Sequence, residues 1–199
     1  MAVSRLSRQS VQAGFPKQQT IWDQTSQTAA MDAITSAQLP TNSTAFLFNN
    51  IPATYTHLQI RGLVRSTYAQ AIGIGWQMQM GPASGIDTGN NYSYHLLGGD
   101  GSSVFTGGQT GVSFMGVGEV NGSSSTAGMW TTFIIDILDY SNTNKTKNIR
   151  VLEAQEVNGS GKIQLASGLW NSTQAVGTIS LNCSQTLVSG CTASIYGIK

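Results

Sequence analysis

The sequence contains few charged residues. Only 10% of its 199 residues are Asp, Glu, Lys or Arg, and the net charge is +1, whereas charged residues make up about 25% of a typical soluble protein. Gly, Ser, Thr, Asn and Gln take their place. Intrinsic disorder requires low hydrophobicity and a high net charge. Because hydrophobic residues make up 40% of the chain, the composition indicates a folded protein with a polar, uncharged surface.

The sequence also lacks a cluster of basic residues. The ten Lys and Arg residues are spread along the chain, and the closest group is Lys145, Lys147 and Arg150. We interpret this group as a solvated turn followed by the start of a strand. Binding to nucleic acid through its phosphates requires clustered positive charge, so no nucleic-acid partner is predicted.

Long hydrophobic runs are missing as well. No segment approaches the eighteen or so apolar residues of a transmembrane helix, so no membrane partner is predicted. Residues 1–14 contain Arg5 and Arg8 but not the apolar core of a secretory signal. We therefore expect the chain to be made and assembled in the cytoplasm of the cell that synthesises it.

Cysteine is scarce, with Cys183 and Cys191 on either side of a short polar loop. A hairpin can bring two such residues close enough for a disulfide. The alternative, which we favour, is two small buried thiols in a protein assembled in a reducing compartment. Two cysteines without a matched second pair do not form a zinc site, and no metal or cofactor is predicted.

Residues 1–43 differ from the rest and are predicted to form an extended N-terminal arm. The arm is rich in Gln, Ser, Thr and Ala, with a weak helical pattern at residues 29–37. Its isolated apolar side chains are candidate anchors, which can pack either on the arm's own body or on a neighbouring molecule: Phe15, Ile21, Trp22 and Leu39.

Residues 44–199 are predicted to form one β-domain. In residues 54–65 and 71–80, apolar and polar side chains alternate, which is the pattern of a half-buried strand. Short strands separated by turns predict an antiparallel β-sandwich or barrel. The other candidate strands are residues 92–98, 112–120, 130–140, 147–157, 162–170, 175–183 and 191–198.

Turn residues lie between these segments. Asn121-Gly122 and Asn158-Gly159 predict tight hairpin turns, because both central positions of such a turn need a positive φ. Residues 98–101 and 107–108 are glycine-rich and predict a longer surface loop. Residues 133–138 are apolar on both faces and predict a central strand buried on both sides.

Candidate catalytic residues do not form a convincing site. Asp136 and Asp139, like Glu153 and Glu156, lie three residues apart, so the members of each pair point to opposite faces of a strand. His57 and His95 lie in alternating strands without metal-binding spacing. The sequence therefore predicts that the protein is not an enzyme.

Aromatic residues offer a second candidate site, because exposed rings can stack on sugars. Trp76 lies on the apolar side of its strand, which favours the core. The remaining candidates for contact with a host glycan are Trp130, Trp170, Tyr92 and Tyr94.

Residues 51–62, IPATYTHLQIRG, resemble a family of small structural virion proteins of tailed phages that infect aquatic bacteria. The resemblance continues in order through residues 91–96, 99–103, 135–145 and 194–199, and so spans about residues 44–199. It implies a single jelly-roll-like β-sandwich on the surface of the particle. It supplies no active site, and the arm lies outside it.

Two structural functions are therefore considered. The first is a capsid decoration, or cement, protein that forms a homotrimer and attaches to the major capsid protein through its arm. The second is a tail-fibre or receptor-binding domain that recognises host glycans. Fibres usually contain repetitive shafts, and the sequence has no such repeat, which favours decoration.

Overall fold

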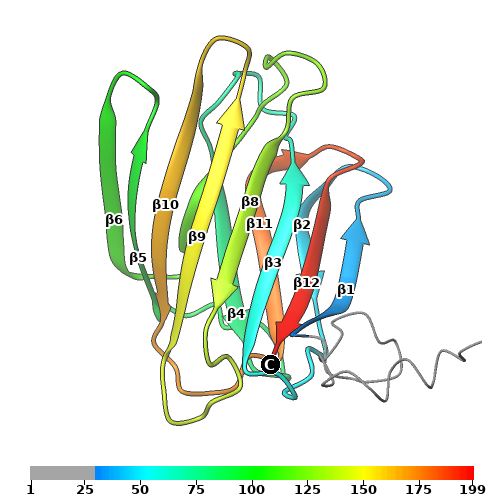
Figure 1. Cartoon of the computed structure of the whole chain (residues 1–199), viewed down its shortest axis with the longest axis vertical. Coiled ribbons are helices and arrows are strands. Elements are labelled where there is room, and N and C mark those ends of the chain that lie inside the picture. Colours follow the sequence, from blue (N-terminus) through cyan, green and yellow to red (C-terminus); the bar gives the residue numbers. More distant parts are fainter. Residues whose placement is uncertain (1–29) are drawn as a thin grey trace, which may run out of the picture.

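A computed structural model describes residues 30–199, which form two antiparallel β-sheets packed face to face (Figure 1). No helix that could span a membrane occurs in this range. The strands are β1 (Met31–Gln38), β2 (Ser43–Phe48), β3 (His57–Val64), β4 (Ile74–Gly81), β5 (Tyr92–Gly99), β6 (Val104–Val112), β7 (Met115–Val120), β8 (Thr131–Ile137), β9 (Lys147–Glu156), β10 (Gly161–Trp170), β11 (Thr178–Leu187) and β12 (Thr192–Ile198).

The two sheets differ in size. The large sheet has eight strands in the order β1-β12-β3-β8-β9-β10-β5-β6, and the small sheet has four in the order β2-β11-β4-β7. Strands β1 and β6 are the edges of the large sheet and lie on opposite sides of the molecule in Figure 1. The prediction of an all-β sandwich is confirmed.

Alternating side chains build the core between the sheets. Trp76 and Met78 of β4 are fully buried, as are Leu58 and Ile60 of β3, so the predicted apolar faces of both strands are confirmed. Trp76 meets Phe133 of β8 across the interface, with 5.7 Å between the ring centroids. Burying a side chain of this size contributes about 1.5 to 3 kcal/mol, so the shared core accounts for the packing of the two layers.

Strand β8 lies inside the large sheet, between β3 and β9. Its inward side chains, including Ile135 and Ile137, are fully buried. The prediction that this segment is buried on both sides is wrong: Ile134 is only half-buried, and Leu138 is 46% exposed. The four-stranded sheet covers one face of the large sheet, and nothing among residues 30–199 covers the other.

Part of the predicted arm belongs to the sheet. Residues 31–38 form strand β1, which pairs with β12 along its length. The helical pattern considered for residues 29–37 is therefore wrong, because backbone pairing with β12 outweighs a weak local preference. Phe15, Ile21 and Trp22 lie outside the described residues.

The two Asn-Gly pairs behave differently. Asn158 and Gly159 have φ values of +64° and +108° and connect β9 to β10, so this tight turn is confirmed. Asn121 is fully buried at the start of a long connection from β7 to β8, and its side-chain Nδ2 donates to the backbone oxygen of Glu156 at 3.0 Å. The prediction of a tight turn at Asn121-Gly122 is wrong, because this asparagine serves as a buried hydrogen-bonding residue.

Glycine-rich residues 98–108 form a hairpin rather than a long loop. Gly98 and Gly99 end β5, Gly107 and Gly108 lie within β6, and the two strands are paired in register. The turn between them is held by Asp100, whose Oδ1 accepts hydrogen bonds from the backbone nitrogens of Ser102 and Ser103 at 2.9 and 2.7 Å.

Candidate functional site

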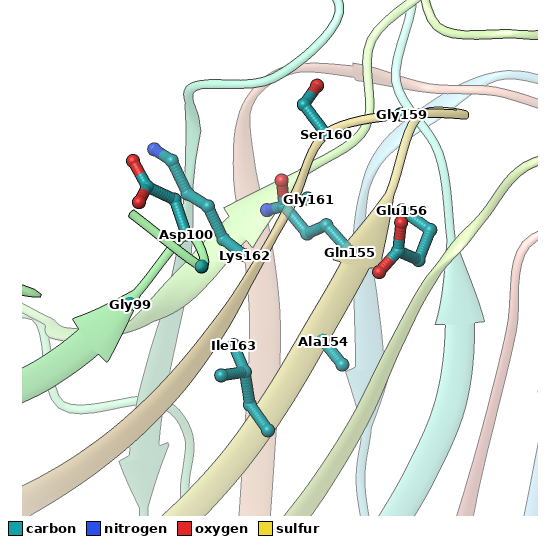
Figure 2. A pocket seen from close by; sticks show the side chains of 11 residues that line it. Gly99, Asp100, Ala154, Gln155, Glu156, Gly159, Ser160, Gly161, Lys162 and Ile163 are labelled. Carbon is teal, nitrogen blue, oxygen red and sulfur yellow. The ribbon is translucent and has the colours of Figure 1, made fainter. Parts of the chain in front are cut away.

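A groove of about 430 Å³ lies at one end of the large sheet, beside the β5–β6 and β9–β10 turns (Figure 2). The β5–β6 turn is stabilised by the hydrogen bonds to Asp100. The β9–β10 turn is formed by Asn158 and Gly159, which both have positive φ values. Glycine backbone separates the side chains that line the groove. These include Asp100, Gln155, Glu156, Ser160, Lys162 and Ile163.

Lys162 is the cation of the groove. Its Nζ lies 2.7 Å from Oε2 of Glu119 on β7 and 5.3 Å from the centre of the Phe105 ring on β6. The ammonium group therefore joins three strands. In Figure 2 the Lys162 side chain extends on the same side of the groove as Asp100. The groove thus carries both signs of charge together with the hydroxyl group of Ser160.

Beneath the groove, between the sheets, lies a buried polar cluster of Glu153, Gln155 and Gln164. Gln164 Nε2 donates to Glu153 Oε2 at 3.0 Å, while Glu153 Oε1 and both amide atoms of Gln155 have no hydrogen-bond partner. The side chain of Glu153 lies over Gly118, where an added Cβ would be 2.9 Å from Glu153 Cγ. Gly118 therefore provides the space that this carboxyl group occupies.

Burial raises the pKa of Glu153 to about 8, against the opposing effect of nearby amide groups. The folded protein therefore carries this residue as a neutral acid at neutral pH. A protonated carboxyl group is far cheaper to bury than a carboxylate. Glu153 is fully buried, so it meets neither solvent nor a ligand in the groove.

The carboxylates considered for catalysis are engaged separately. Asp136 accepts hydrogen bonds from Gln59 and Arg150 on the outer face of the sheet, at 2.7 and 2.8 Å. Glu153 points into the core, whereas Glu156 is exposed. The predicted opposite orientation of Glu153 and Glu156 is therefore confirmed.

Asp139 has a φ of +50° in the turn after β8 and forms a small charged cluster. Its Oδ2 accepts a hydrogen bond from Lys145 Nζ at 2.6 Å, and its backbone nitrogen donates to His57 Nδ1 at 3.0 Å. The Lys145 hydrogen bond is the main cause of a lowered Asp139 pKa. His57 is thus a hydrogen-bonded residue, as expected for a strand histidine, and His95 is exposed on β5.

Lys147 is buried, so the interpretation of the basic group at residues 145–150 as wholly solvated is wrong for this residue. Its Nζ donates to three backbone oxygens, those of Asn142, Lys145 and Thr173, at 2.6, 2.6 and 3.2 Å. Desolvation lowers its pKa. The three carbonyl groups compensate the loss of hydration of the buried ammonium group. Lys147 therefore links the β8–β9 and β10–β11 loops rather than binding an external partner.

The outer face of the large sheet presents an apolar row. Leu97, Leu165 and Leu152 are direct cross-strand neighbours on β5, β10 and β9. They are 51, 54 and 42% exposed, and Ile163, two residues from Leu165, is 55% exposed. Half-buried Ile134 continues the row onto β8, opposite Leu152. A contiguous exposed apolar patch of this kind is typical of an interaction surface.

The predicted anchor Leu39 packs on its own domain. It is half-buried against the core, and its backbone nitrogen donates to the oxygen of Cys191 at 2.9 Å. Leu39 therefore belongs to the sandwich rather than to a partner surface.

Two of the four glycan candidates are wrong. Tyr92 and Trp170 are buried, and both hold the loop around Asp87: Tyr92 Oη donates to the backbone oxygen of Asp87 at 2.6 Å, and Trp170 Nε1 to its Oδ2 at 2.8 Å. Trp130 and Tyr94 are half-buried. Tyr94 stacks on Phe114, with 6.5 Å between centroids. Sugar contact by these two residues stays a prediction.

Cys183 and Cys191 are both buried and free, which confirms the interpretation of two buried thiols. Burial raises the pKa of both. Within residues 30–199, no three His, Cys, Asp or Glu side chains gather as a metal site would require.

The sequence analysis did not identify the polar cluster or the apolar row. Both features could have been found from the alternation of inward and outward side chains along β9 and β10. Glu153 and Gln155 continue the inward face of Ile149 and Val151, while Leu152 and Leu165 fall on the outward face. Comparisons of the chain with protein-family models, with curated proteins and with solved structures find no match.

Proposed function

We propose that this chain is a non-enzymatic structural component of a tailed-phage virion, and specifically a capsid decoration protein. It is assembled in the host cytoplasm, attaches to the major capsid protein and to copies of itself, and lies on the particle surface. We also propose that the sandwich is jelly-roll-like, as in other virion proteins. Its N-terminal segment attaches it to the particle, and copies of the chain form an oligomer.

The observation that carries this proposal is the apolar row on the outer face of the large sheet. Leu97, Leu152 and Leu165 form one stripe across three neighbouring strands, and each is at least 42% exposed. Removing such side chains from water contributes about 25 cal/mol per Å². A shell component gains this free energy when the face packs on protein.

The polar chemistry of the domain supports a structural role. Asp136, Asp139 and Lys147 each complete a hydrogen-bond network that holds strands or loops together. Glu153, whose pKa burial raises to about 8, is sealed between the sheets. These groups stabilise a rigid body suited to repeated packing.

Copy number in the intact particle tests the proposal. Quantitative mass spectrometry of purified virions, with cryo-microscopy to locate the chain, is expected to give a copy number that matches the capsid lattice. A copy number that matches the tail would overturn decoration, and absence from the particle would overturn a virion role.

A receptor-binding domain that recognises host glycans is the second candidate, and the groove is the observation that favours it. Asp100, Ser160 and Lys162 place acceptor and donor groups around a hollow of about 430 Å³, a volume suited to a small ligand. Binding to a glycan array that is lost in Lys162→Met would support this function. The variant keeps an unbranched side chain and removes the charge that lies over Phe105.

A further inference from the structure

Strand β6 is an unprotected edge of the large sheet. Among the described strands it pairs with β5 alone, and every residue from Thr106 to Gly111 is exposed. Both faces of this stretch therefore contact solvent, and its outer backbone groups are available for pairing. Natural proteins usually protect such edges with charge, proline or a bulge.

The sequence of β6, VFTGGQTGV, contains neither charge nor proline. Its one irregularity lies near its end, where Gly111 has a φ of +65° and the register to β5 shifts. The preceding residues, 104–110, stay regular. An edge of this length and composition is a ready template for a further strand.

Absence of charge specifically suits pairing of β6 with a second β6. Two-fold symmetry places identical strands antiparallel, so each residue faces the residue at the same distance on the other side of the axis, and a strand without charge meets no like charge in any register. We propose that two copies of this chain associate through β6, antiparallel about a two-fold axis at Gly108. This joins two eight-stranded sheets into one continuous sheet.

This register pairs Thr106 with Thr110 of the second copy, and glycine with glycine at the axis. Thr106 lies opposite Leu97 on the outer face, and Thr110 lies opposite Ser93 on the same face. Threonine pairs are favourable across antiparallel strands. The pairing also places the apolar rows of two copies on the same side of one sheet, which doubles the surface available to a shell protein.

Sedimentation velocity of the purified full chain tests the pairing without the particle, so its outcome is separate from that of the proposed virion role. The wild type is expected to form a concentration-dependent dimer. Thr106→Lys with Thr110→Lys puts lysine opposite lysine twice and is expected to weaken association about tenfold. Thr106→Lys with Thr110→Glu puts opposite charges across the axis and is expected to restore it.

Thr132→Lys is the matched control, because it adds a charge to an exposed position of β8 away from the edge and is expected to leave association unchanged. A wild-type chain that stays monomeric would overturn the proposal. So would a trimer, since a two-fold contact produces even numbers, or equal association of the lysine–lysine and lysine–glutamate variants.

Discussion

At the residue scale, buried polar side chains define one end of the sandwich. Glu153 receives a hydrogen bond from Gln164 at 3.0 Å, yet its second oxygen and the neighbouring Gln155 amide have no partner. Buried polar groups without partners are costly. The neutral form of Glu153 lowers that cost, so the protonation state of a single residue is linked to folding.

Glu153→Gln is predicted to remove a pH dependence of stability. The pKa of Glu153 is about 8 in the folded protein against 4.5 in a model peptide, so the folded state retains a proton that the unfolded state releases. The free energy of unfolding of the wild type therefore falls as pH rises from 4.5 to 8, by about 4 kcal/mol. Urea denaturation across that interval measures it, and the amide variant should lack this slope.

Glu156→Gln is the control for this prediction. It removes an exposed carboxylate from the end of the same strand, and the pH dependence should remain that of the wild type. An unchanged slope in Glu153→Gln would show that another group couples protonation to folding.

Individual site residues were predictable only in part. Cys183 and Cys191 were predicted as two small buried thiols, and both are buried and free. Lys147, Tyr92 and Trp170 could not be placed, because each is buried through hydrogen bonds to loops that are distant in sequence. Local sequence cannot show which carbonyl groups compensate a buried polar atom.

At the element scale, the interior strands of the sandwich were predictable, whereas the two edge strands of the large sheet were not. Strands β3 and β4 alternate because one face meets the core. Strand β6 is exposed on both faces, so no alternation marks it, and its glycines suggest a loop. Strand β1 was likewise assigned to the arm. These two strands depend on pairing with a neighbour rather than on a buried face, and that pairing is not visible locally.

Ile135→Asp is predicted to prevent folding. Ile135 is fully buried at the centre of β8, between β3 and β9. Burial of an unpaired carboxylate costs several kcal/mol or more. This cost is comparable to the whole free energy of unfolding of a typical domain, about 5 to 15 kcal/mol. Far-UV circular dichroism and solubility on expression measure the loss.

Thr132→Asp adds the same charge to the exposed face of β8 and should give a soluble, folded protein. Native-like expression of Ile135→Asp would contradict the central position of this strand. Failure of both variants would point to an effect of charge on the whole strand rather than on its buried face.

At the scale of the whole molecule, two surfaces of the described residues are available for assembly. The apolar row covers the outer face of β5, β9 and β10, and the edge of β6 is open. The row adjoins the β6 edge, because Leu97 lies opposite Thr106, so pairing through β6 leaves the row free to pack on a shell protein. In the chain, residues 1–29 precede β1, which is the opposite edge of the large sheet, and they are the segment proposed to attach to a separate protein.

Deletion of residues 1–29 is predicted to leave folding intact and abolish incorporation into particles. The deletion keeps β1 and its pairing with β12, so the thermal unfolding midpoint should match the full chain. Attachment should be lost because Phe15, Ile21 and Trp22 are removed, and each such side chain contributes about 1.5 to 3 kcal/mol when fully buried. Deletion of residues 1–40 is the informative comparison, since it also removes β1 and should lower the midpoint. Immunoblots of purified virions measure incorporation, and a normal copy number for the shorter deletion would assign attachment to the apolar row instead.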